Sequence, residues 1–419
     1  MGLFKKIFRV FTGEQPEEFQ ETSDLFEEVT SSSNAKDAAY EENAGNSLIK
    51  ITITKNTFLK EKEVISIAIP NTVTKLTQAQ IADAKNYNIT AIDLSDCDNV
   101  LILGDNVFSA FNFKKVILPE NIEEIGERAF YGCDSLMKID LSNCWKLKSI
   151  KGHAFESCCN LTHVRLPEDI EEIGEYAFHG CRSLEYNIDL SKCQNLRVIK
   201  GHAFDACEKL TDVRLPEDVE EIGEYAFHEC SSLKYSIDLS KCKKLKSIKE
   251  GTFEQCNNLS DVRLPEDIKE IGEHAFRWCE SLRTIDLSNC KKLRAIKDTA
   301  FELCKKLSDV DFPEDIEEIG KHAFYLCGSL RTIDLSNCQK LRVIKGHAFD
   351  ACKELTHVHF PENIEEIGSC VFQLCDSLRI IDLSNCKKLS EIDTYMLGVS
   401  KDDMKKKIIP PEGVKILRH

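Results

Sequence analysis

The sequence repeats itself, and this repetition limits the possible folds more than any other feature. The segment LPEDIEEIGEYAFHGCRSL begins at Leu166, and near-copies begin at Leu215 and Leu264. A second motif stands between the copies and begins at Ile139, Ile188, Ile237, Ile285, Ile333 and Ile381. Aligning both motifs on their phenylalanines gives a period of 23 to 26 residues from Phe130 to Phe372. A period in the twenties with spaced leucines is typical of a leucine-rich solenoid.

One repeat cannot fold by itself. A coil of about 24 residues buries about six apolar side chains, each worth about 1.5–3 kcal/mol, whereas ordering its backbone and side chains costs about 1.5 kcal/mol per residue. Stacking lets each coil cover its neighbours, so stability becomes a sum over adjacent coils. The sequence holds about fourteen coils, and a strand spacing of about 4.8 Å predicts a rod of about 65 Å.

The local pattern predicts two short strands and a turn in each coil. Residues 163–166 and 138–141 are expected to form strands of one parallel sheet, with Val164 and Leu166 pointing inward and Arg165 outward. Residues 169–173 are expected to form a second short strand. We expect residues 177–181 to form a helical turn on the opposite wall. Lysines replace Gly174 in the other coil type, so this glycine is interpreted as permissive.

The first motif resembles the BspA-like leucine-rich repeat. The matching positions are Val164, Leu166, Pro167, Ile170, Ile173, Gly174, Ala177, Phe178, Cys181 and Leu184, and they recur in every second coil between about residues 64 and 390. The second motif carries the leucine–cysteine–leucine pattern at Leu141, Cys144 and Leu147. The resemblance implies a leucine-rich-repeat solenoid, with a parallel β-sheet on the concave side and short helical turns opposite. It also implies a non-catalytic surface or interaction protein of bacteria or protists.

The twenty cysteines follow the repeat. One column follows the phenylalanines, from Cys133 to Cys375, and another runs from Cys97 to Cys386; only Cys159 and Cys370 fall outside. Small apolar thiols suit a narrow interior column, so we predict buried, reduced cysteines. No cysteine or histidine spacing fits a zinc site, and the histidines at His153 and equivalent positions alternate with tyrosine and arginine. Disulfides stay open, because adjacent coils bring Cα atoms to about 5 Å.

Charges alternate between the coil types. The coils with proline are acidic and the coils that follow are basic, so the alignment sets Glu220 against Lys246 and sets Glu171 against both Lys148 and Arg197. Such exposed pairs contribute about 0–1 kcal/mol each, but a slip by one coil would bring like charges together. We therefore interpret the pattern as a self-neutralising face. Lys269 breaks it.

The outward residue of each first strand is the candidate binding position, because the concave sheet of a solenoid is the usual binding surface. These residues alternate between aspartate and arginine, as in Arg165, Arg214 and Arg263, until Asp311 stands where arginine is due. Asp286, Asp311 and Asp334 then follow one another, and like charges about 5 Å apart repel by about 1 kcal/mol in water. The functional interpretation is a site for a basic protein segment or for a cation. The alternative is one drifted repeat position.

The ends of the chain differ from the repeats. Residues 1–13 form a basic amphipathic segment, whose apolar residues at helical spacing are candidates for contact with a membrane: Leu3, Phe4, Ile7, Phe8 and Phe11. The alternative for this segment is a frayed tail. Residues 14–47 are acidic and polar and predict a disordered linker. We expect the solenoid over 48–398 and a partial repeat or cap over 399–419.

The sequence carries no catalytic, phosphate-binding or zinc motif, so no enzyme activity and no cofactor are predicted. The net charge of −16 argues against binding of nucleic acid. We expect a monomeric, non-catalytic scaffold that binds a protein partner on its concave sheet. Without an evident signal peptide, the expected location is the cytoplasm or, through residues 1–13, the membrane periphery. The alternative is a BspA-like adhesin or antigen that reaches the cell surface without a signal peptide.

Overall fold

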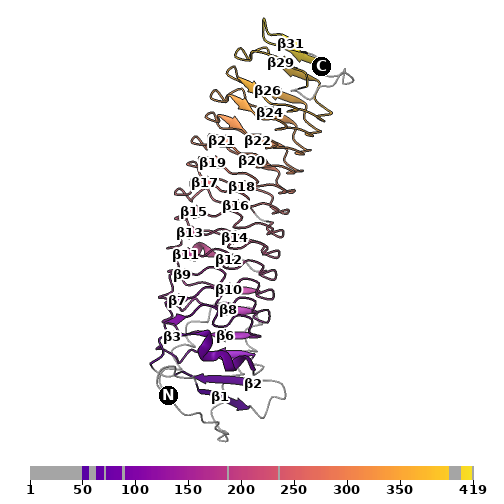
Figure 1. Ribbon diagram of the computed structural model, residues 1–419. Coiled ribbons are helices and arrows are strands. Elements are labelled where there is room, and N and C mark those ends of the chain that lie inside the picture. The colour runs from indigo at the N-terminus through magenta and orange to yellow at the C-terminus, as the bar shows by residue number, and fades with distance from the viewer. Residues whose placement is uncertain are drawn as a thin grey trace, which may run out of the picture.

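The computed structural model describes residues 50–55, 63–69, 72–86, 90–185, 188–234, 236–395 and 407–417. Figure 1 shows a long stack of coils that starts at the hairpin of β1 (Lys50–Lys55) and β2 (Glu63–Ala68) and ends near β29 (Ile392–Asp393) and β31 (Ile416–Leu417). Only this hairpin pairs antiparallel in the described part; all later strand pairs are parallel. The stack has about 13 turns, close to the number expected, which confirms the parallel solenoid.

Each coil places one short strand on each of two walls. The first wall consists of β4 (Ala91–Asp93), β6 (Lys115–Ile117), β8 (Lys138–Asp140), β10 (His163–Arg165), β12 (Ile188–Asp189), β14 (Val213–Arg214), β16 (Ile237–Asp238), β18 (Val262–Arg263), β20 (Thr284–Asp286), β22 (Asp309–Asp311), β24 (Thr332–Asp334), β26 (His357–His359), β28 (Ile380–Asp382) and β30 (Lys407–Ile409). The second wall consists of β3 (Lys75–Leu76), β5 (Ile102–Leu103), β7 (Glu124–Ile125), β9 (Ser149–Ile150), β11 (Glu172–Ile173), β13 (Val198–Ile199), β15 (Glu221–Ile222), β17 (Ser247–Ile248), β19 (Glu270–Ile271), β21 (Ala295–Ile296), β23 (Glu318–Ile319), β25 (Val343–Ile344), β27 (Glu366–Ile367), β29 and β31.

The third wall, which we name the turn wall, is made of turns and not of the helical turns expected from the sequence. Helix in the described residues is confined to η2 (Gln78–Asn86) and η3 (Leu190–Lys192). In each coil two residues take the left-handed conformation, such as Tyr176 with φ 55° and Gly180 with φ 70°, which interrupts a right-handed helix. Alternate N–H groups instead donate to the next coil, as Phe178 does to the carbonyl of Ala203 at 2.8 Å.

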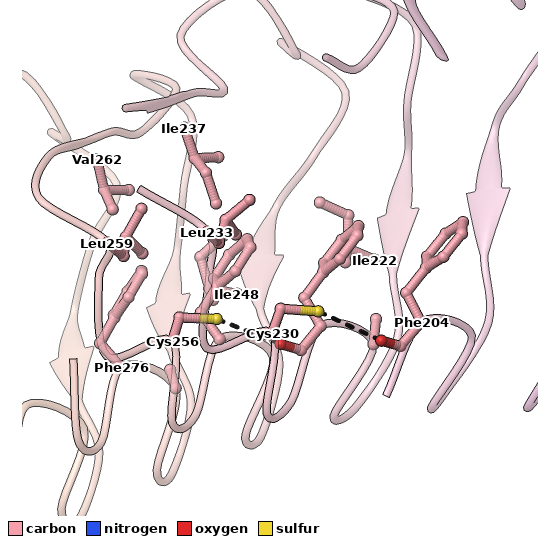
Figure 2. Packing of buried hydrophobic residues seen from close by; sticks show 14 of the residues in the cluster. Phe204, Ile222, Cys230, Leu233, Ile237, Ile248, Cys256, Leu259, Val262 and Phe276 are labelled. Carbon is pink, nitrogen blue, oxygen red and sulfur yellow. Dashed lines mark hydrogen bonds between the residues drawn. The ribbon is translucent and has the colours of Figure 1, made fainter. Parts of the chain in front are cut away.

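The interior is a set of identical columns. The phenylalanines from Phe130 to Phe372 stack face to face, with ring centroids 5.0 to 5.9 Å apart and ring planes within 12° of parallel. Figure 2 shows two of these rings, Phe204 and Phe276, beside buried leucine, isoleucine and valine side chains of neighbouring coils. Because each ring is covered by the coils before and after it, the interior exists only in the stack.

The cysteines are interior donors, as their columns predicted. The described residues contain no disulfide bond between cysteines, and only Cys97 and Cys159 are partly exposed. In the column that follows the phenylalanines, each thiol donates to the carbonyl of a phenylalanine in the preceding coil. Cys230 donates to Phe204 at 3.3 Å and Cys256 to Phe227 at 3.2 Å (Figure 2). The same bond recurs from Cys133 to Cys375 at 3.1 to 3.3 Å.

Gly174 is required by the packing of coils, so its interpretation as a permissive residue was wrong. A Cβ atom built on Gly174 would lie 2.6 Å from the carbonyl oxygen of Ile150 in the preceding coil and 2.7 Å from the carbonyl carbon of Lys151. Both atoms belong to the backbone and cannot swing away. The two coil types are therefore not equivalent at this position. In the proline coil the backbone lies so close to the backbone of the preceding coil that there is no room for a Cβ atom.

Candidate functional site

The outward residues of the first-wall strands form one continuous surface, which we name the strand face. In β8, β20, β22, β24, β26 and β28 the middle residue is buried and the two flanking residues are exposed, as the alternation of side chains along a strand requires. The six predicted binding residues all lie exposed in one column of this face: Arg165, Arg214, Arg263, Asp286, Asp311 and Asp334.

The arginines are held by neighbouring aspartates. Arg165 Nη1 lies 3.4 Å from Asp140 Oδ2 on the adjacent strand, as the alternation of charges suggested. Arg214 Nε lies 3.1 Å from Asp212 Oδ2, two residues earlier and just before β14. Arg263 has the equivalent contact with Asp261 at 3.8 Å. The three guanidinium groups are more than half exposed, and ion pairs that water reaches contribute little to stability.

A second set of carboxylates is fixed by local turns that the sequence reasoning missed. Asp140 Oδ1 accepts the backbone N–H of Ser142 at 3.0 Å and its hydroxyl at 2.6 Å. The same pairing of aspartate with the serine two residues later recurs at Asp189, Asp238, Asp286 and Asp334. These hydrogen bonds favour the ionised form, and with Arg263 they hold the pKa of Asp238 below its usual value. The repeated Asp-Leu-Ser triplet was the available signal.

The three predicted acidic residues do come together. Asp286 and Asp311 stand opposite each other in the register of β20 and β22, and β24, which carries Asp334, packs next to β22. Asp334 is tied to Ser336 and faces His359, which both lower its pKa. Within the described residues, the carboxylate of Asp311 has no hydrogen-bond or ion-pair partner. Asp311 is thus a charged residue of the strand face whose side chain makes no hydrogen bond or ion pair, among the described residues, that would stabilise the fold.

The backbones of the oppositely charged segments are aligned as the sequence predicted. The charged side chains, however, form ion pairs with residues other than the predicted ones. The N–H of Glu171 donates to the carbonyl of Lys148, yet the ammonium of Lys148 lies 3.7 Å from Asp169. Lys244, and not Lys246, lies against Glu220, at 3.3 Å. Lys246 is aligned with Lys269, which breaks the alternation of charges. The charge of Lys246 is offset by Asp267, whose carboxylate lies 3.1 Å from Lys246 and 2.5 Å from Lys292.

Metal and thiol chemistry find no support in the described part of the chain. It contains no group of three or more histidine, cysteine, aspartate or glutamate side chains arranged to hold a metal ion. Burial raises the pKa of Cys144 to about 12 and that of Cys242 to about 11, so these thiols stay protonated and weakly nucleophilic. The predicted membrane-contact residues Leu3, Phe4, Ile7, Phe8 and Phe11 lie outside the described residues. No helix among the described residues could cross a bilayer.

One cluster was missed by the sequence reasoning. From Phe155 to Phe276 the residue after the phenylalanine alternates between acid and base along the turn wall, and these side chains are largely buried: Glu156, His179, Asp205, His228, Glu254 and Arg277. The alternation is visible in the sequence once the coils are aligned on their phenylalanines.

Comparisons with known proteins agree with this architecture. The model of the BspA type leucine rich repeat region matches residues 51–185, 186–294, 235–341 and 290–402. A search of curated proteins found no match. A leucine-rich repeat protein from Bacteroides ovatus is 24% identical, with a TM-score of 0.50 over 88% of this chain and 100% of the other.

Two further solved structures are less alike. The pneumococcal vaccine antigen PcpA is 17% identical, with a TM-score of 0.45 over 89% of this chain and 97% of its own. A leucine rich cell surface protein from Faecalibacterium prausnitzii is 18% identical, with a TM-score of 0.29 over 92% of this chain and 96% of its own. Since the family model spans nearly all of the repeats, the chain belongs to the BspA-type leucine-rich repeat family.

Proposed function

We propose that this protein is a non-catalytic scaffold that binds a protein partner through the strand face. One observation carries the proposal: the interior columns are nearly uniform from coil to coil, whereas the strand face changes at Asp311, where the fold gains nothing from the change. A position that the fold leaves free can be occupied by a recognition residue. The same reasoning supports the absence of catalysis, because the repeated carboxylates and thiols already have structural partners.

The partner that fits this surface is a basic segment of another protein. Asp286, Asp311 and Asp334 lie on three adjacent strands, so their carboxylates are about 5 Å apart along the stack. A lysine or arginine placed over Asp311 would offset the mutual repulsion of the three and would bring a new ion pair to an unpaired carboxylate. Complementary charge of this kind raises association rates and selects partners more than it adds affinity.

The test compares two variants with the same change of charge on one coil. Partners are captured from native lysate with the intact protein and then measured against Asp311→Arg and Glu314→Arg. Glu314 is exposed on the same coil but lies outside β22. We expect Asp311→Arg to abolish binding and Glu314→Arg to preserve it, with both variants as stable as the parent. Full affinity in the Asp311→Arg variant would remove the acidic residues from the site.

A second candidate function is a cell-surface adhesin or antigen, which membership of the BspA-type family favours. The two candidates differ in location, and the first predicts a cytoplasmic protein, at most peripherally bound to membrane through residues 1–13. Surface labelling of intact cells combined with fractionation separates them. Labelling of the intact cells supports the surface candidate. Loss of membrane association on deletion of residues 1–13 supports the peripheral arrangement.

A further inference from the structure

The acid–base column of the turn wall forms a partly buried ladder, which we name the histidine–carboxylate ladder: Glu156, His179, Asp205 and His228, with His153 and His202 beside them. Asp205 is its centre. Its Oδ1 lies 2.8 Å from His228 Nδ1 and its Oδ2 lies 2.9 Å from His202 Nδ1, while His179 Nε2 lies 3.8 Å away. Only 11% of the Asp205 side chain is exposed, so water screens these contacts weakly.

Glu156 repeats this arrangement one step earlier. Its carboxylate lies 2.5 Å from His153 Nδ1 and 3.4 Å from His179 Nδ1. His179 therefore stands between two carboxylates, and its buried Nδ1 makes no hydrogen bond.

Aromatic rings hold the ladder in place. The rings of His153, Tyr176, His202 and Tyr225 stack in order, with centroids 5.0, 4.5 and 5.1 Å apart. The edges of Tyr176 and Tyr225 meet His179 and His228. His202 is thus stacked between two tyrosines while its Nδ1 contacts Asp205.

The charged groups that surround the ladder are mostly acidic. His228 also lies near Glu229 and Glu254, Tyr176 lies near Glu175, and Tyr225 donates to Glu250 and lies near Glu224. The amide of Gln255 contacts His228 Nε2 at 3.3 Å. The cation Arg277 lies against the far carboxylates of Glu254 and Glu302, at 3.3 and 3.0 Å, and so closes the ladder at that end.

The pKa values follow from these surroundings. Burial alone would lower the pKa of His228, but the hydrogen bond and the charge of Asp205 outweigh burial and raise it. Burial would raise the pKa of Asp205, but hydrogen bonds from His228 and His202 lower it. The raised histidine stabilises the fold below its unfolded pKa of about 6.5 and loses that effect as the pH rises through its folded pKa. Asp205 stabilises the fold above its unfolded pKa, and this stabilisation is lost only when the pH falls through its lowered folded pKa.

His322, near the other end of the turn wall, has the opposite arrangement. The residue after the phenylalanine of its coil is Tyr325, whose ring lies 5.3 Å from His322, so no carboxylate stands at that position. His347 faces His322, with ring centroids 4.8 Å apart, but His347 has a carboxylate partner of its own, because its Nδ1 lies 3.0 Å from Asp350 Oδ2. Burial lowers the pKa of His322, and the charges of His347 and Lys321 add to this, while Asp350 and Asp298 oppose it. Acid therefore destabilises the coil of His322 as the pH falls below the unfolded histidine pKa.

We propose that the turn wall is a pH-responsive device with two opposite responses: mild acid tightens the coils of the histidine–carboxylate ladder and loosens the coil of His322. Neighbouring coils respond locally because the stability of a solenoid is a sum over adjacent repeats. A fall in pH would then redistribute stability along the rod without a change of fold. The strand face of the loosened coil carries Asp311, and Asp334 follows on the next strand, so a bound partner would sense the change.

The test is hydrogen–deuterium exchange of the whole protein at about pH 7.5 and about pH 5.5, corrected for the intrinsic pH dependence of exchange. We expect opening of residues 202–231 to become severalfold rarer in acid and opening of residues 318–326 to become severalfold more frequent, since one unit of pKa shift is a factor of about ten. His228→Asn should remove the acid gain. His274→Asn, whose histidine contacts the hydroxyl of Thr299 at 2.7 Å and no carboxylate, should keep it.

A direct measurement covers the case in which His228→Asn fails to fold. Exchange of the imidazole carbon-bound hydrogens in the parent protein, followed by mass spectrometry, gives the titration midpoint of each histidine. The proposal requires His228 to titrate above His322. The same direction of change in both segments, or a midpoint of His322 equal to or above that of His228, would overturn it.

Discussion

Phe204 on the turn wall and Arg214 on the strand face are under different structural constraints. Phe204 is fully buried between Phe178 and Phe227, with ring centroids 5.3 and 5.4 Å away, and a phenylalanine occupies this position in successive coils. Arg214 is largely exposed on the strand face, and its column contains arginine, aspartate and histidine. The interior thus admits one residue type because it must match both neighbours, whereas the strand face can vary without affecting the stack.

The sharpest test of this difference is the Phe204→Ala substitution. Removal of a fully buried ring leaves a cavity that the rigid column cannot fill, so we expect a loss of about 3–5 kcal/mol. Urea denaturation of the repeat region measures the loss, and hydrogen exchange should place it in the adjacent coils. A loss below about 1 kcal/mol would mean that the column can collapse around a gap, and the contrast between interior and face would then fail.

A smaller effect is expected at Gly174. The Gly174→Ala substitution places a methyl group 2.6 Å from the carbonyl oxygen of Ile150, and overpacking of this kind costs about 1–3 kcal/mol. Gly328→Ala is the matched control, because nothing lies within 4 Å of the added Cβ. Equal stability of the two variants would show that the coils can separate without cost.

The Cys230→Ala substitution should cost less again. It removes the hydrogen bond to the carbonyl of Phe204, which is worth about 1 kcal/mol, together with a small buried volume. Cys159→Ala changes a partly exposed thiol outside the repeated columns and should be nearly neutral. Alkylation kinetics give an independent measurement, since Cys159 of the parent protein should react faster than the fully buried Cys230 until the protein unfolds.

On the strand face the expected effect on stability is the smallest. Arg214→Ala removes a pair between an exposed guanidinium and the largely buried carboxylate of Asp212, and because water reaches one partner we expect a loss of no more than about 1 kcal/mol. The variant should unfold with the parent in urea, and any deficit should instead appear in partner binding. A stability loss as large as that of Phe204→Ala would place Arg214 among the structural residues.

The sequence was sufficient for features that depend on one coil and its period. The phenylalanine column, the buried thiols from Cys133 to Cys375 and the outward position of Arg165 all follow from residue spacing, because identical coils must stack in register. The family resemblance agreed with the same pattern. These features require no knowledge of where a neighbouring backbone lies.

Features that depend on the distance between coils could not be predicted in this way. Gly174 is needed only because the backbone of Ile150 comes so close. The turn wall was expected to be helical because left-handed residues such as Tyr176 and His153 have side chains that carry no signal for that conformation. Lys148 likewise pairs with Asp169 and not with Glu171, because a long flexible side chain can reach several carboxylates and residue spacing does not determine which one it contacts.

The alternation of two coil types sets the unit in which a gene for such a protein can change length. Lysines of the cysteine-type coils pair with carboxylates of the proline-type coils, as Lys244 does with Asp218 and Lys340 with Asp315. An in-frame duplication or deletion of one pair of coils, 48 or 49 residues between successive prolines from Pro167 to Pro361, restores every such contact at the junction. Loss of a single coil joins two acidic or two basic coils. Recombination between repeats should therefore add or remove coils in pairs, and related genes should differ in length by multiples of the pair.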